Sequence, residues 1–108
     1  MDQEANALLE SLLNSLLEDF NHWFNRGQEL LNACPDSVMT LNERNAMATR
    51  LSEGLKAIDA SRALVQATPT AMAISMEAMT PWHQLVLEVW GLAARISQFN
   101  AANTTQAP

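Results

Sequence analysis

Asp19 and His22 have the spacing that di-iron helical bundles use to bring a carboxylate and an imidazole to one metal ion. In those bundles the motif occurs on two helices, and its side chains point into the core. In this sequence the motif occurs once, and His22 lies almost opposite the apolar side of its predicted helix, so a solvated polar face is the better interpretation. One cysteine and two histidines are also too few for a closed zinc site. We therefore predict no metal site and no cofactor.

Cys34 is the single thiol of the chain and its candidate nucleophile. No histidine or basic residue stands next to it in the sequence to activate the thiol, so we interpret it as a small core residue. No glycine-rich phosphate loop, nucleophile elbow or Ser/His/Asp set can be assembled from the remaining residues. The sequence therefore predicts a protein that is not an enzyme and has no catalytic residues.

The tryptophans are the more informative residues. The chain has three tryptophans and no tyrosine in 108 residues. Tryptophan at helical spacing is usually core, but it is also the residue most enriched at binding hot spots. His83 lies at the edge of the apolar arc of the third predicted helix, where it either hydrogen-bonds a backbone carbonyl or donates to a partner. These residue types indicate binding rather than catalysis.

Few turn signals interrupt the chain, which contains three glycines and four prolines. The clearest breaks fall at residues 34–37, at residues 68–70 and in a polar stretch over residues 100–108. Helical periodicity predicts helices at about 4–33, 41–67 and 81–98, with a short helix or turn at about 70–79. We expect an all-α, antiparallel three-helix bundle that forms a single domain over residues 1–99, followed by a flexible, disordered C-terminal tail over residues 100–108.

The first two predicted helices form a hairpin around Pro35. The first carries apolar residues at alternating spacings of four and three: Leu9, Leu13, Leu16, Phe20, Trp23, Gly27, Leu30 and Cys34, widened on one side by Leu17, Phe24 and Leu31. The second begins with Thr40 and Glu43, which are spaced as a capping box. In this hairpin Arg62 comes level with residues 10–13, which predicts an ion pair with Glu10.

The third helix carries an excess of apolar surface. Pro81 can begin this helix, with Thr80 as N-cap, or kink a longer helix from about residue 71; we favour the first arrangement. Apolar residues then cover about two thirds of the circumference, roughly twice the usual arc. Either the helix lies in the crease between the other two, or another chain covers part of it. The candidate partner-binding residues at the edge of this arc are His83, Leu87, Trp90 and Leu92.

Charge and hydropathy exclude two classes of partner. The chain has 12 Asp and Glu against 6 Lys and Arg, a net charge of −6, whereas nucleic-acid affinity depends on clustered basic residues. No apolar run approaches the ~20 residues that span a bilayer. The acidic first residues and the unpaired cysteine favour a reducing cytoplasm. We therefore expect a cytoplasmic protein with no nucleic-acid partner and no stable membrane insertion.

Two stretches of the sequence resemble a known family. They are Leu16-Leu17-Glu18-Asp19-Phe20 with Trp23-Phe24 and Leu30-Leu31, and Met79-Thr80-Pro81-Trp82-His83-Gln84-Leu85-Val86 with Glu88 and Trp90. These residues resemble a small family of uncharacterised helical proteins from cyanobacteria, over about residues 8–96, and the Pro-Trp-His-Gln-Leu-Val stretch is the most specific part. The resemblance implies a cytoplasmic cyanobacterial protein without an assigned activity or known cofactor. Short helical proteins of this kind serve more often as accessory, assembly or regulatory factors than as metabolic enzymes.

We therefore predict a small, non-enzymatic interaction, accessory or regulatory protein that binds a protein partner through the surplus apolar surface of the third helix. Two alternatives remain open. The same surface could close against a second copy in a homodimer, the commonest oligomer. Alternatively, Trp23, Trp82 and Trp90 could line a cavity between helices that carries a flat apolar ligand.

Overall fold

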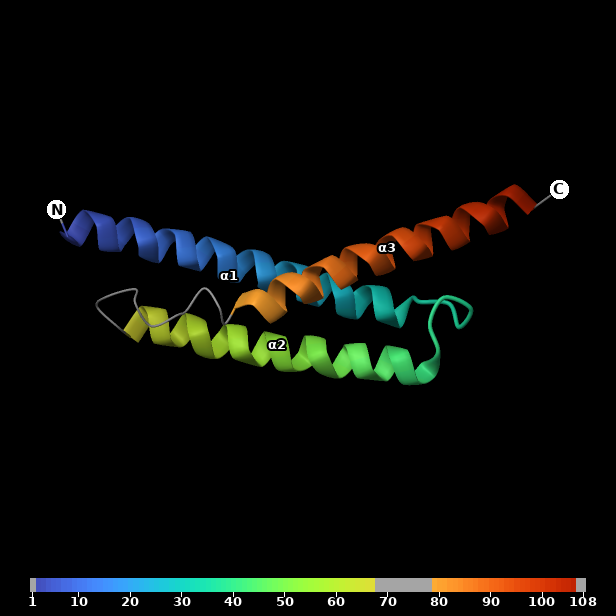
Figure 1. Cartoon of the computed structure of the whole chain (residues 1–108), viewed down its shortest axis with the longest axis horizontal. Helices are drawn as coiled ribbons and strands as arrows, with labels where there is room; N and C mark the ends of the chain where they lie inside the picture. Colours follow the sequence, from blue (N-terminus) through green and yellow to red (C-terminus); the bar gives the residue numbers. More distant parts are fainter. Residues whose placement is uncertain (1, 68–78, 107–108) are drawn as a thin grey trace.

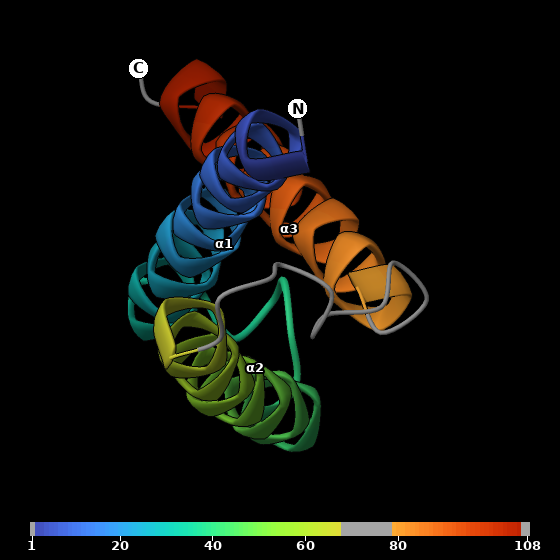
Figure 2. The same ribbon diagram turned by 90° about the vertical axis from the view of Figure 1, so that its left-hand side faces the viewer.

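Three long α-helices make up the fold (Figure 1). The computed structural model describes residues 2–67 and 79–106, in which α1 spans Asp2–Asn32, α2 spans Leu41–Ala67 and α3 spans Thr80–Gln106. α1 and α2 form an antiparallel hairpin, and α3 crosses α1 while running in the same general direction as α1. The end-on view shows that the three helix axes are inclined to one another (Figure 2). The prediction of an all-α, three-helix protein is confirmed.

The helix boundaries agree with the sequence at α2 and at the start of α3. α2 has the predicted limits, and α3 begins at Thr80, which places Pro81 in its first turn and confirms that Pro81 opens the helix. The predicted short helix at about 70–79 falls almost entirely outside the described residues. Residues 107–108 of the predicted tail also lie outside them.

α3 continues to Gln106 instead of ending at Gln98, so the tail expected from Asn100 is helical over residues 100–106. This stretch is polar but contains no glycine or proline to end a helix, and Ala101 and Ala102 are the strongest helix formers. Figure 1 shows the last turns of α3 projecting beyond the α1–α2 hairpin. Helical propensity therefore outweighs the polarity on which the shorter prediction rested.

The hydrophobic core lies along α1, because α1 is the helix that packs against both α2 and α3. The fully buried side chains come from all three helices and from the residue just before α3: Leu17, Phe24, Leu51, Ile58, Val65, Met79 and Val89. On α1 the centre of the buried side is the row of Leu17, Phe24 and Leu31, which the sequence placed at one edge. Leu9 is exposed, and Leu16 and Trp23 are only partly buried. Because α2 and α3 pack on different sides of α1, the most deeply buried residues of α1 are Leu17, Phe24 and Leu31 and not the residues that the sequence analysis placed at the centre of the apolar side.

Two glycines allow the helices to approach closely. A Cβ atom on Gly54 of α2 would lie 2.6 Å from Cε2 of Phe24. A Cβ atom on Gly27 of α1 would lie 2.9 Å from Cγ2 of Val89 and 3.0 Å from Cδ1 of Leu51, so Gly27 marks the place where all three helices meet. The sequence placed Gly27 on the buried side of its helix, but Gly54 was missed because a glycine adds no apolar signal.

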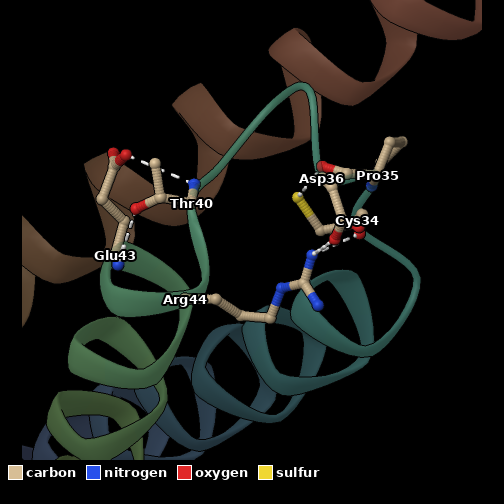
Figure 3. A network of polar contacts seen from close by, with 6 residues as sticks. All are labelled: Cys34, Pro35, Asp36, Thr40, Glu43 and Arg44. Atoms are coloured by element: carbon tan, nitrogen blue, oxygen red, sulfur yellow. Dashed lines mark hydrogen bonds and ion pairs between the residues drawn. The ribbon is translucent and has the colours of Figure 1, made fainter.

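Arg44 at the start of α2 holds the turn between α1 and α2 (Figure 3). Nη2 of Arg44 donates to the backbone oxygen of Cys34 and to Oδ1 of Asp36, both at 2.9 Å. The Cys34 side chain is buried, as predicted. From α3, Arg95 donates to the backbone oxygen of Val38 in the same turn. These contacts tie the hairpin turn to α2 and to α3.

The predicted register of the hairpin, that is, which residues of α1 lie opposite which residues of α2, is wrong. Arg62 of α2 pairs with Glu18 of α1, with 3.7 Å between Nη2 and Oε1, and not with Glu10. The prediction took Pro35 as the centre of the turn. In the structure the connection runs over residues 33–40 and contains its own hydrogen bond, from the Val38 N–H to the Pro35 oxygen at 3.0 Å. The longer turn moves its centre toward Val38, so each α2 residue faces a later residue of α1.

The capping box at the start of α2 is confirmed (Figure 3). The Glu43 N–H donates to Oγ1 of Thr40 at 3.1 Å, and the Thr40 N–H donates to Oε1 of Glu43 at 3.3 Å. Both bonds satisfy backbone donors that a helix N-terminus otherwise leaves unpaired.

Thr40→Ala removes this cap and is expected to lower the free energy of unfolding by about 1 kcal/mol. Thr49→Ala is the matched control, because Oγ1 of Thr49 donates only to the Asn45 oxygen within α2 and the residue is exposed. Alanine at position 49 should be neutral or slightly stabilising. Urea unfolding followed by circular dichroism measures both. Equal effects at the two positions would contradict a specific role for the cap.

Candidate functional site

One face of α3 is exposed along most of the helix. We call it the outer face of α3 and define it by six exposed residues at helical spacing: His83, Leu87, Trp90, Gly91, Ala94 and Gln98. Leu87 is 60% exposed and Trp90 is 46% exposed. No charged residue belongs to this face of the described helix. The two charged residues of α3, Glu88 and Arg95, lie on one flank and bond elsewhere, to Arg50 and to the Val38 oxygen.

A shallow groove between α1 and α3 borders the outer face. Its volume is about 180 Å³, and it is lined by Leu16, Asp19, Phe20, Trp23, His83, Val86 and Trp90. The rings of Trp23 and Trp90 meet edge to face, with 5.5 Å between their centroids. Phe20 packs in the same way against His83 at 4.9 Å. Such aromatic contacts fix the exposed rings in place.

The structure separates the four predicted binding residues. His83, Leu87 and Trp90 lie together on the outer face of α3, and His83 and Trp90 also line the groove. Leu92 is 2% exposed and belongs to the core cluster, so it contributes no surface. The sequence analysis missed Gly91, Ala94 and Gln98. The sequence could have indicated these three residues, because they are uncharged and follow Leu87 at intervals that place them on the same side of a helix.

A second pocket lies between α2 and α3. It has a volume of about 310 Å³ and is lined by Arg50, Glu53, Gly54, Ala57, Pro81, Trp82 and Leu85. Trp82 therefore lines a different pocket from Trp23 and Trp90, although the carrier alternative placed the three around one cavity. The groove with two tryptophans is also smaller than the roughly 300–1,000 Å³ of typical small-molecule sites.

A bidentate ion pair joins α2 to α3 beside this pocket. Nη1 of Arg50 donates to Oε1 of Glu88 at 2.8 Å, and Nη2 donates to Oε2. The hydrogen bonds from Arg50 lower the pKa of the Glu88 carboxyl, charge attraction lowers it further, and partial burial opposes both. The same hydrogen bonds raise the pKa of Arg50. Both side chains are about half exposed, so solvent weakens the pair.

Because the folded state lowers the pKa of Glu88, the ion pair stabilises the fold above the ordinary glutamate pKa of about 4.3 and loses this effect as the pH falls through the lowered value. Glu88→Gln should therefore lower the free energy of unfolding by about 0–1 kcal/mol at neutral pH. The difference from wild type should vanish in acid. Urea unfolding of both proteins across this pH range measures it, and a difference that persists or grows in acid would contradict the assignment.

The residues considered first for metal or covalent chemistry form no metal-binding group among the described residues. Asp19 lines the α1–α3 groove, His22 is exposed and packs edge to face against Trp23, and Cys34 is buried in the hairpin turn. Within residues 2–67 and 79–106, no three His, Cys, Asp or Glu side chains gather as a metal-binding group. No described helix is long and apolar enough to cross a membrane.

Fold and surface together define a small all-α protein with an exposed, uncharged helix face. Residues 3–98 match the family described as "Protein of unknown function (DUF2605)", and the chain belongs to this family. This agrees with the resemblance to an uncharacterised protein family. No curated protein and no solved structure matches the chain.

Proposed function

We propose that this chain is a non-enzymatic accessory or regulatory protein of the cytoplasm that works by binding a protein partner through the outer face of α3. One observation carries the proposal: the outer face exposes Leu87 and Trp90, and none of its six residues is charged. The centres of protein interfaces are depleted in charge and enriched in tryptophan. A helix face that only meets water usually carries charged residues.

The shape of the surface favours a protein over a small molecule. The outer face is long, and the groove beside it, at about 180 Å³, is small for a drug-sized ligand. Trp90 is exposed but held against Trp23, so binding would order few additional side-chain rotamers. Tryptophan is among the residues most enriched at binding hot spots, so Trp90 is the strongest candidate anchor of this face.

The charges of the molecule support the same interpretation. The net charge of −6 resides mainly on α1 and the start of the turn after it, because residues 1–36 carry seven acidic side chains and one basic one. α3 carries one charge of each sign. The neutral outer face therefore suits an apolar protein surface and not a phosphate backbone. The resemblance to a cyanobacterial family of small helical proteins adds the expectation of an accessory role in such a cell.

The size of the native assembly tests this proposal. A tagged chain, produced at its natural level in its source cells, should enter an assembly larger than the 11.9 kDa chain. Leu87→Glu should release it as a monomer, because a buried, unpaired carboxylate opposes association. Leu41→Glu is the matched control, since Leu41 is 66% exposed and lies at the start of α2.

Gel filtration and cross-linking of the extracts compare the three proteins, and circular dichroism confirms that each variant remains helical. An assembly that survives Leu87→Glu, or a wild-type chain that is monomeric in the extract, would overturn the proposal.

A further inference from the structure

The middle of the outer face of α3 places two large residues before two small ones. Leu87 and Trp90 come first along the helix, Gly91 and Ala94 follow them, and His83 and Gln98 stand at the two ends of the face. A helix face with this order is complementary to itself when a second copy runs in the opposite direction. In that arrangement Leu87 and Trp90 of each copy meet the two small residues of the other.

Nothing in the part of the chain that the structure describes accounts for a glycine at position 91. A Cβ atom there would meet no atom of the described residues within 4 Å, whereas one at Gly27 or Gly54 would contact a neighbouring helix. No described glycine has a positive φ, so the backbone at Gly91 does not require glycine either. A glycine in the middle of a helix destabilises it by about 1 kcal/mol relative to alanine. Close approach of a surface from outside the chain would account for it.

We infer that the partner at the outer face of α3 is a second copy of this chain, packed antiparallel about a two-fold axis between Trp90 and Gly91. This inference rests on the proposed function and names its partner. In this pairing Leu87 lies opposite Ala94 of the second copy, and Trp90 lies opposite Gly91. Each contact occurs twice, as an isologous interface requires. A parallel pairing would place Leu87 against itself and leave a gap at Gly91.

Charge favours a second copy over a charged partner. The outer face places no charge at the contact, so two copies meet without like-charge repulsion there, although each chain carries −6. Glu88 is occupied by Arg50, and Arg95 by the Val38 oxygen. At the ends of the interface His83 comes level with Gln98 of the second copy, and these two side chains can form a hydrogen bond. A basic or acidic partner would need complementary charges, which the described outer face does not supply.

Sedimentation equilibrium of the purified full-length chain, at micromolar concentrations, tests the inference. We expect twice the chain mass of 11.9 kDa. Leu87→Gln and Gly91→Gln should each weaken the dimer more than about tenfold, which corresponds to about 1.4 kcal/mol. Leu41→Gln, the matched control at an exposed leucine on α2, should leave the dissociation constant unchanged. A monomeric wild-type chain would overturn the inference.

Exchanging the paired residues tests the antiparallel geometry. Leu87→Ala and Ala94→Leu should each weaken the dimer, the first by leaving a gap and the second by crowding two leucines. Combining both in one chain restores one large and one small residue at each contact and should recover most of the affinity. A double variant that dimerises no better than either single variant would contradict this pairing.

The two proposals fail differently. A purified chain that is monomeric, together with a native assembly that Leu87→Glu disrupts, would overturn the second copy as partner but support binding at the outer face. A native assembly that Leu87→Glu leaves intact would overturn the proposed function itself. A purified dimer that is insensitive to Leu87→Gln would overturn the inference, because the copies would then meet elsewhere.

Discussion

Replacing Gly54 with valine is expected to lower the free energy of unfolding by about 3 kcal/mol. The first added carbon would lie 2.6 Å from Cε2 and 2.9 Å from Cδ2 of Phe24. The Phe24 ring is fully buried and cannot move aside without disturbing the contact between α1 and α2. Helix propensity alone predicts the opposite sign, because valine forms helices better than glycine. Urea unfolding, followed by circular dichroism, therefore separates packing from propensity.

Gly91→Val is the matched control for this prediction. It makes the same substitution in a helix, at a position where an added Cβ meets no atom of residues 2–67 or 79–106 within 4 Å. At a concentration low enough to keep the chain monomeric, Gly91→Val should leave the stability unchanged or raise it slightly. A Gly54→Val variant as stable as wild type would show that α1 and α2 do not approach as closely as the structure indicates.

Phe24→Ala is expected to produce the largest single loss of stability, about 3–5 kcal/mol. Phe24 is fully buried, stands in the centre of the core side of α1 and fills the space over Gly54. Removing its ring also removes the obstacle to a side chain at position 54. Gly54→Ala should therefore destabilise the wild-type protein but stabilise the Phe24→Ala protein, since only the gain in helix propensity remains.

A double-mutant cycle measures this reversal. The four proteins are wild type, Phe24→Ala, Gly54→Ala and the double variant, and the quantity compared is the free energy of unfolding in urea. Equal effects of Gly54→Ala in both backgrounds would show that the Phe24 ring is not what Gly54 accommodates.

Local signals predicted the helices well. The capping box of Thr40 and Glu43 and the position of Pro81 fixed two helix starts, because each acts through neighbouring residues. The predicted end of α3 was wrong, since residues 100–106 contain no glycine or proline to end a helix. The predicted pairing of Arg62 was also wrong. It depended on the length of a turn, which is set by contacts of Arg44 and Arg95 that sequence spacing does not reveal.

The candidate site could be predicted only in part, for a geometric reason. Periodicity shows that α3 has too much apolar surface, but it does not show which edge α1 covers. Leu87 and Leu92 were both placed at an edge of the arc, but the structure buries Leu92 in the core and leaves Leu87 60% exposed. The Arg50–Glu88 pair joins residues 38 positions apart, so no local pattern could predict it. Gly91 became informative only when its surroundings were known.

Cross-linking from the outer face of α3 in living cells tests most directly whether this face binds a protein. A photo-reactive amino acid replaces Leu87 in one version of the chain and Leu41 in another, and both are produced at the natural level. We predict a discrete cross-linked protein from position 87, and none from position 41, where the leucine is slightly more exposed. An absence of cross-links from position 87, or the same products from both positions, would contradict binding through the outer face of α3.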